Sequence, residues 1–247
     1  MSGERGVAVV TGASSGIGAA TVRHLAAVGF DVVGGARRID QLRDVCEGVG
    51  GRALPLDVTD PASVDAFCAE VGPCRVLVNN AGGALGLEPL EHADLTRWQA
   101  MFDTNVLGVA RLTQGLLPAL EASGDGHVVV IGSIAAHETY AGGAGYNAAK
   151  FAVRAVTQVL RAELLGHPVR VTEIDPGAVE TEFSLVRFDG DADRAAKVYE
   201  GMTPLSADDV AACIAFAVAL PSHVNIDSLV VTARDQLGTR AMHRRPT

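Results

Sequence analysis

Residues 7–25 combine three patterns in an order that few folds accept. Val7–Val10 is an apolar, valine-rich run that predicts a short buried strand, and a helical pattern extends from Ala19 to Leu25. The eight residues between them, TGASSGIG, contain three glycines. A strand, a glycine-rich turn and a helix in immediate succession are typical of the first unit of an open, twisted α/β sheet.

The glycine-rich turn also predicts a ligand. Glycines let the backbone turn tightly and approach a pyrophosphate, whose negative charge is favoured at the amino terminus of a helix. An ordinary turn is the alternative, but the strand and helix on either side favour a dinucleotide. The residues expected to contact this cofactor are Gly12, Ser14, Ser15, Gly16, Ile17 and Gly18.

Strand patterns and helical patterns alternate along the rest of the chain. Further strands are predicted at 31–36, 52–56, 75–78, 127–131, 169–174 and 228–232, and helices at 39–48, from Pro61 onward, 94–120, 146–156 and 207–220. This alternation predicts an α/β fold: a Rossmann-type, doubly wound parallel sheet with helices on both faces. The length fits one such domain, which we expect over residues 1–247.

The end of the second predicted strand distinguishes between two nicotinamide cofactors. An acidic side chain there holds the ribose 2′-hydroxyl of NAD, whereas an arginine accommodates the 2′-phosphate of NADP. Here Ala36 is followed by Arg37 and Arg38, without an acid. Guanidinium groups pair well with phosphate, so the sequence favours NADP(H). The alternative is that both arginines only solvate a loop.

Charge and cysteine content argue against several other classes of protein. The formal net charge is −9 without a Lys/Arg block, which argues against nucleic acid or an anionic membrane as a partner. No apolar run reaches the roughly 20 residues that span a bilayer, and residues 1–5 do not begin a signal peptide. Cys46, Cys68, Cys74 and Cys213 lack CxxC spacing, so we expect reduced cysteines, no metal and a cytoplasmic location.

A second group of polar residues follows the predicted strand 127–131. Ser133 lies where this strand ends, and open α/β sheets bind ligands at the carboxyl ends of their strands. Tyr146 and Lys150 are four residues apart, which places them on one face of a helix. A neighbouring ammonium lowers the pKa of a phenol from about 10, as a general acid or base requires. The alternative is a solvated helix face with an ordinary tyrosine.

These motifs together resemble the short-chain dehydrogenase/reductase family. The spacing GxxxGxG, the NNAG motif at 79–82, Ser133 and Tyr146-x-x-x-Lys150 occur in the family's order, and the resemblance extends over nearly the whole chain. It implies hydride transfer between NADP(H) and a carbonyl or secondary alcohol. The tyrosine would act as general acid/base, the serine would orient the oxygen, and the lysine would lower the tyrosine pKa and hold the nicotinamide ribose. Asn105 matches the family's asparagine, which supports a proton-relaying water.

The resemblance implies further cofactor contacts. Asp57 and Val58 would line the adenine pocket, although Thr59 or Asp60 is equally suited to cap the helix that Pro61 begins. The NNAG residues would border the cofactor; a simple turn is the alternative. The other expected contacts are Asn80, Ala81, Gly82, Tyr146, Lys150 and, in a PGxxxT element against the nicotinamide, Pro176, Gly177, Val179 and Thr181.

The last third of the chain bears on substrate and assembly. Residues 182–205 are mixed and charged, and we interpret them as a substrate lid, with a solvated loop as the alternative. The tail, 221–247, follows Leu220 with a segment resembling LPxHVNI of the NADP-dependent 3-hydroxy acid (serine-type) dehydrogenase branch. This tail packs at a subunit interface in that branch, so we expect a homodimer or homotetramer. His137 and Glu138 are candidates to line the pocket, with ordinary packing as the alternative.

The substrate is predicted only as a small-molecule carbonyl or alcohol. One alternative is a ketoreductase or alcohol dehydrogenase of small-molecule biosynthesis that acts on a bulkier cyclic substrate. Gly83, Ala84, Gly142 and Gly143 would leave room for such a molecule. Another is a non-catalytic, nucleotide-sensing scaffold, against which the intact set of Asn105, Ser133, Tyr146 and Lys150 argues.

Overall fold

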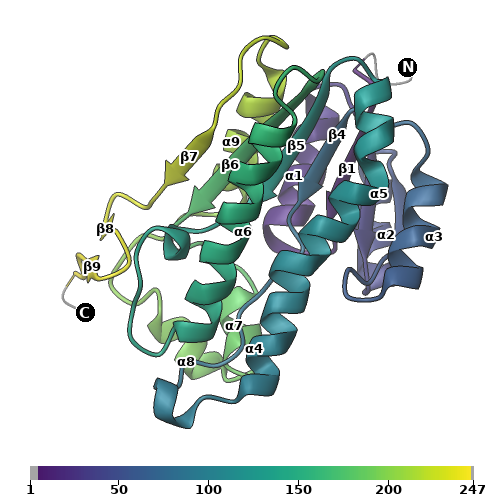
Figure 1. Ribbon diagram of the computed structural model, residues 1–247. Coiled ribbons are helices and arrows are strands. Elements are labelled where there is room, and N and C mark those ends of the chain that lie inside the picture. Colours follow the sequence, from purple (N-terminus) through teal and green to yellow (C-terminus); the bar gives the residue numbers. More distant parts are fainter. Residues whose placement is uncertain (1–4, 246–247) are drawn as a thin grey trace.

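The computed structural model describes residues 5–245, in which seven strands form one parallel sheet in the order β3-β2-β1-β4-β5-β6-β7 (Figure 1). All neighbouring strands of this sheet run in parallel. The predicted parallel sheet is therefore confirmed. Its strands are β1 (Val7–Thr11), β2 (Asp31–Ala36), β3 (Arg52–Pro55), β4 (Val76–Asn79), β5 (Gly126–Ile131), β6 (Val169–Pro176) and β7 (Ser228–Val231).

Helices cover both faces of the sheet, as predicted (Figure 1). One face carries α1 (Gly16–Ala27), α2 (Ile39–Glu47) and α9 (Ala207–Ala219), with α1 packed against both of the others. The other face carries α3 (Pro61–Val71), α4 (Leu95–Phe102), α5 (Gly108–Ala122) and α6 (Ala144–Glu163). Within residues 5–245 no helix combines the length and apolar character needed to cross a lipid bilayer.

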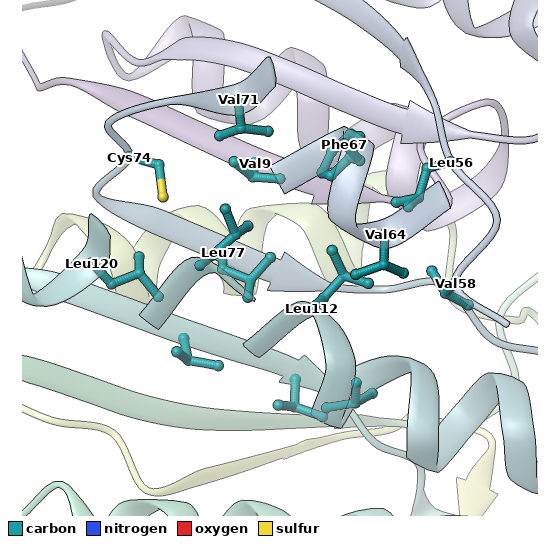
Figure 2. Close-up of a cluster of buried hydrophobic side chains, with 14 of the residues drawn as sticks. Val9, Leu56, Val58, Val64, Phe67, Val71, Cys74, Leu77, Leu112 and Leu120 are labelled. Carbon is teal, nitrogen blue, oxygen red and sulfur yellow. The ribbon is translucent and has the colours of Figure 1, made fainter. Parts of the chain in front are cut away.

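Two apolar clusters hold the helices against the sheet. In the first, Leu77 of β4 and Leu112 of α5 are fully buried and meet Phe67 of α3 (Figure 2). Successive strand residues point to opposite faces, so Val9 enters this cluster while Val10 enters the second, beneath α1 and α9. Burying one such side chain contributes about 1.5–3 kcal/mol to folding. The strand ends that form the site therefore rest on a sheet packed from both sides.

The strand order reverses at β1, which pairs with β2 on one side and with β4 on the other. Open α/β sheets bind ligands in the crevice that such a reversal leaves at the carboxyl ends of the strands. The glycine-rich turn leaves β1 at this point. The topology therefore places this turn at the mouth of the crevice.

The connecting segments hold more structure than the sequence indicates. A π-helical turn, Asp103–Leu107, divides the predicted helix 94–120 into α4 and α5. The interpreted lid contains the short helices α7 (Phe183–Arg187) and α8 (Ala192–Lys197). The tail forms an unpredicted hairpin of β8 (Gln236–Leu237) and β9 (Ala241–Met242). Strands and helices this short contain too few residues for a periodic pattern. Single 3₁₀ turns lie at Leu90–His92 and Ile134–Ala136.

We predict that Leu77→Ala lowers the free energy of unfolding by about 2–5 kcal/mol, because it leaves a cavity between β4 and α5. Leu165→Ala is the matched control, since Leu165 is 88% exposed, and its expected effect is within about 0.5 kcal/mol. Urea unfolding monitored by circular dichroism measures both. Equal midpoints for the two variants would contradict this account of the core.

Candidate active site

A cavity of about 730 Å³ lies at the carboxyl ends of the central strands. Its size falls within the range of ligand pockets, about 300–1,000 Å³. Most of the predicted site residues line it: Gly12, Ser14, Ser15, Gly16, Ile17, Arg37, Arg38, Asp57, Val58, Asn80, Ala81, Gly82, Ser133, Tyr146, Lys150, Pro176, Gly177, Val179 and Thr181. Gly18, Asn105, His137 and Glu138 lie outside its lining, and so do Ala84, Gly142 and Gly143, which were expected to leave room beside the pocket.

The glycine-rich turn needs its glycines for two different reasons. Gly12 and Gly16 have φ angles of 64° and 53°, a left-handed conformation that other residues rarely adopt. A Cβ atom at Gly18 would lie only 2.3 Å from the carbonyl oxygen of Gly12. Gly18 therefore lets α1 begin directly beneath the turn, and it shapes the cavity from behind without facing it.

Arg38 stands at the end of β2, beside the glycine-rich turn. Its guanidinium donates hydrogen bonds to the hydroxyls of Ser14 and Ser15, and its Nη1 pairs with Glu182 at 2.9 Å. The last residue of β2, Ala36, provides no carboxylate that would repel a phosphate. One guanidinium with two hydroxyls is a donor set that fits a 2′-phosphate, which would replace Glu182 as the partner of Nη1.

The polar side chains of the segment after β3 have mainly a structural role. Asp57 Oδ1 accepts hydrogen bonds from the backbone N–H and the hydroxyl of Thr59, at 2.9 and 2.7 Å. Burial opposes ionisation of Asp57, but these bonds and the charge of Arg37 outweigh it and lower the pKa of the carboxyl. Asp60 caps α3 by accepting from Ala62 N–H at 3.0 Å, which confirms one of the two capping alternatives. Asp57 borders the cavity while its carboxylate holds the turn.

The NNAG motif joins β4 to its neighbours. The Thr11 hydroxyl accepts hydrogen bonds from the backbone N–H groups of Asn80 and Ala81, at 3.0 and 2.9 Å. In return the Asn80 side chain donates to the carbonyl oxygen of Thr11 at 2.9 Å. Asn79 donates to the hydroxyl of Thr113 on α5 at 3.1 Å. These bonds tie the motif to β1 and to α5, so it is more than a simple turn.

Ser133, Tyr146 and Lys150 come together at one end of the cavity. Ser133 begins the 3₁₀ turn after β5, and its hydroxyl accepts from Ala135 N–H. Tyr146 and Lys150 lie on α6, with Lys150 Nζ 5.8 Å from the centroid of the Tyr146 ring. Lys150 Nζ donates to the carbonyl oxygen of Ile131 at 2.8 Å. All three side chains are at least nine-tenths buried.

Burial dominates the protonation of the tyrosine and the lysine. It raises the pKa of Tyr146 well above its usual value, while a hydrogen bond with Ser133 and the charge of Arg187 act in the opposite direction. Burial lowers the pKa of Lys150 to about 8, although the charges of Asp175 and Glu173 oppose the decrease. Burial thus favours the neutral phenol of Tyr146. That Lys150 lowers its pKa stays a prediction.

Asn105 supports the site from the π-helical turn. Its side-chain amide donates to the carbonyl oxygens of Met101 and Gly83, and its Oδ1 accepts from Gly83 N–H. The extra residue of a π-helical turn directs the side chain toward this loop, as such turns often do at functional sites. The amide thus fixes the loop that follows the NNAG motif, and the water relay stays a prediction.

Sequence reasoning missed Arg187, which lines the cavity from α7. Its guanidinium carbon lies 5.5 Å from the centroid of the Tyr146 ring, and its Nε donates to Gly86 carbonyl at 3.2 Å. Phe183, one turn earlier, meets the same ring edge to face at 5.5 Å. A single arginine in a charged segment has no distinguishing spacing, so only the fold reveals its position.

The C-terminal tail also takes part in the site. Gln236, Thr239 and Met242 line the cavity, and Gln236 Oε1 accepts from Ala178 N–H at 2.8 Å. Glu138 does not face the cavity; it accepts hydrogen bonds from Thr239. From the resemblance we expected the tail to matter mainly for assembly, whereas its hairpin forms part of the cavity wall.

Comparisons with known proteins identify the family of this chain. Residues 6–191 match the model of the short chain dehydrogenase family. An uncharacterized oxidoreductase of Mycobacterium tuberculosis is 59% identical over 239 residues, which cover 96% of this chain and 95% of the relative. The NADP-dependent 3-hydroxy acid dehydrogenase of Salmonella typhimurium is 40% identical, with 90% of this chain and 93% of the relative covered.

Among solved structures, the closed form of serine dehydrogenase complexed with NADP⁺ matches with a TM-score of 0.91 at 37% identity, covering 97% of this chain and 100% of that one. The chain therefore belongs to the short-chain dehydrogenase/reductase family, as its motifs predicted. The 3-hydroxy acid dehydrogenase is NADP-dependent and the serine dehydrogenase structure is complexed with NADP⁺, the cofactor that the arginines after β2 predict for this chain.

We predict that Arg38→Ala weakens NADPH binding by about 10- to 100-fold, because a hydrogen-bonded charge pair with the 2′-phosphate is lost. NADH affinity should stay unchanged, since NADH lacks that phosphate. Titrations followed by nicotinamide fluorescence measure both. Arg43→Ala, which removes an exposed arginine of α2, is the control. An equal loss of affinity for NADPH and NADH would show that Arg38 does not bind the 2′-phosphate.

Proposed function

We propose that this protein transfers hydride between NADP(H) and a carbonyl or secondary alcohol, with Tyr146 as the general acid/base. The observation that carries the proposal is the meeting of Ser133, Tyr146 and Lys150 in one cavity with the glycine-rich turn and Arg38. Tyr146 faces the cavity and is hydrogen-bonded to Ser133. Protonation of a carbonyl oxygen needs a proton donor and a second group that orients the oxygen, and these two hydroxyls can supply both.

The chain's own residues account for the proton. NADPH, when bound, supplies the hydride. In reduction, Tyr146 donates its proton to the carbonyl oxygen, and Ser133 donates a hydrogen bond to that oxygen. Charge develops there during transfer, so donors fixed beforehand stabilise the transition state more than the substrate. The buried ammonium of Lys150 and the charge of Arg187 then stabilise the phenolate that remains.

The substrate class is a small hydroxy acid or the corresponding oxo acid. Within residues 5–245 Arg187 contacts no carboxylate, and its guanidinium faces the cavity beside Tyr146. A substrate carboxylate would provide the missing partner. Two of the three proteins named above are a 3-hydroxy acid dehydrogenase and a serine dehydrogenase, and both names denote a hydroxy acid.

The remaining parts of the proposal concern organisation. We infer one domain over residues 1–247, with 182–205 as the substrate lid and 221–247 as a tail that completes the cavity. Phe183 and Arg187 of the lid line the cavity, which supports that role. A homodimer or homotetramer in the cytoplasm is proposed from the family resemblance.

Tyr146→Phe should reduce kcat by about 10²–10⁴-fold, the usual contribution of a general acid. NADPH affinity should change little, because the phenyl ring keeps its place beside Phe183. Steady-state kinetics and a fluorescence titration measure the two effects. Full turnover in this variant would refute the mechanism, and wild-type protein that binds NADPH but turns over no carbonyl would support the nucleotide-sensing alternative.

Arg187→Gln should raise KM for a 3-hydroxy acid by about 10- to 100-fold, since a charge-assisted hydrogen bond is lost. The methyl ester of the same acid should show little change. Arg187→Lys keeps the charge without the planar fork, and an intermediate KM is expected. If KM rises equally for acid and ester, Arg187 serves the lid and not the substrate.

A further inference from the structure

Asp175 of β6 is a completely buried carboxylate that the proposed mechanism does not use. Its Oδ1 accepts a hydrogen bond from the backbone N–H of Ser133 at 2.9 Å. Its Oδ2 lies 2.9 Å from both Nε2 of His137 and the hydroxyl of Ser228. Burying a charge is costly without such partners. Asp175 is outside the cavity lining, directly behind the serine.

Arg154 determines how His137 meets this carboxylate. Its Nη1 lies 2.8 Å from His137 Nδ1 and also donates to the carbonyl oxygen of Ala136. A guanidinium can only donate, so Nδ1 must accept, and the proton of the neutral ring is on Nε2. His137 therefore donates to Asp175. The result is a directed chain of hydrogen bonds from Arg154 through His137 to Asp175.

A second carboxylate lies beside the first. Glu173 is two residues earlier on β6, so its side chain shares a face with that of Asp175. It is buried, and among the described residues its Oε1 has no hydrogen-bond partner. Both carboxylates converge on Gly132, where a Cβ atom would lie 2.0 Å from Asp175 Oδ1 and 2.8 Å from Glu173 Oε1.

Both carboxylates approach Gly132, and Lys150 Nζ donates to the carbonyl oxygen of Ile131, the residue before that glycine. The two carboxylates are the groups that oppose the lowering of the pKa of Lys150 by burial. Burial and the charge of Asp175 raise the pKa of Glu173 to about 7. The ionisable groups around Lys150 are Tyr146 and Arg154 from α6, Glu173 and Asp175 from β6, His137 from the segment after β5, and Arg187 from the lid.

We propose that Asp175 is a positioning residue of the active site, oriented by His137, which fixes the backbone of Ser133 and keeps Lys150 positively charged. The inference rests on the proposed function. Glu173 acts in the same direction with a weaker effect. Gly132 is the residue that lets both carboxylates approach the serine.

The pH dependence of kcat tests the electrostatic part. Lys150 must be protonated, so the rate falls as pH rises through its pKa. Removing the negative charge lowers that pKa, and Asp175→Asn should therefore shift the alkaline limb down by about one pH unit or more. Near pH 6 the rate should fall by a smaller factor than on the alkaline limb, since Asn still accepts from Ser133 N–H although its NH₂ group cannot accept from His137 or Ser228.

Two further variants make this test specific. Glu173→Gln should shift the limb in the same direction by less, and it disturbs no existing hydrogen bond of Oε1. Asp208→Asn removes an equal charge from the exposed start of α9 and should leave the profile unchanged. If Asp175→Asn only lowers the rate by one factor at every pH, or if Glu173→Gln has no effect, the inference is wrong. Wild-type protein without turnover would instead refute the proposed function.

A measurement without cofactor or substrate tests the orientation of His137. In ¹⁵N-histidine-labelled protein near pH 7.5, the signal that disappears in His137→Gln should show its proton on Nε2. In Asp175→Asn the same ring loses its acceptor, and its Nε2 signal should move. A proton on Nδ1, or an unchanged signal in the Asp175 variant, would overturn the hydrogen-bond chain.

Discussion

The bonds between Thr11 and the Asn80-Ala81 backbone are the constraint on which the rest of the site depends. They tie the carboxyl end of β1 to that of β4 at the point where the strand order reverses. The glycine-rich turn leaves one side of this link, and the loop held by Asn105 leaves the other. A shift of either strand would displace the floor of the cavity, so the two apolar clusters that hold the strands also hold the chemistry in place.

The second constraint is electrostatic. Lys150 lies in the interior, where burial lowers the pKa of its ammonium group. The carboxylates Asp175 and Glu173 on β6 oppose that tendency, and the burial of Asp175 is made acceptable by hydrogen bonds from Ser133, His137 and Ser228. The neighbouring strands β5 and β6 therefore make different contributions to the same site. One carries the serine, and the other carries the charge that keeps the lysine ionised.

Much of this arrangement was predictable from the sequence, and the parts that were not have a common cause. The sheet follows from valine-rich runs. Gly12 is recognised by the glycine spacing after the first strand, and Ser133, Tyr146 and Lys150 by their spacing in the segment after the fifth. Arg187 and Asp175 act through contacts between segments far apart in the chain, which no local pattern records. Asn105 was expected from the family resemblance, but its hydrogen bond to Gly83, on the loop after β4, was not. The hairpin of β8 and β9 is too short for any periodicity.

Gly132 shows how a buried charge can limit the variation of a sequence. A methyl group at this position would meet two carboxylates that come from a different strand, 41 and 43 residues further along the chain. A larger residue in place of Gly132 would clash with the carboxylates, and loss of either acid would remove a negative charge that opposes the lowering of the pKa of Lys150. None of the three positions can therefore change alone without cost. Homologous chains should thus keep or replace all three positions as one unit, and an engineer who alters the serine's neighbour must redesign β6 at the same time.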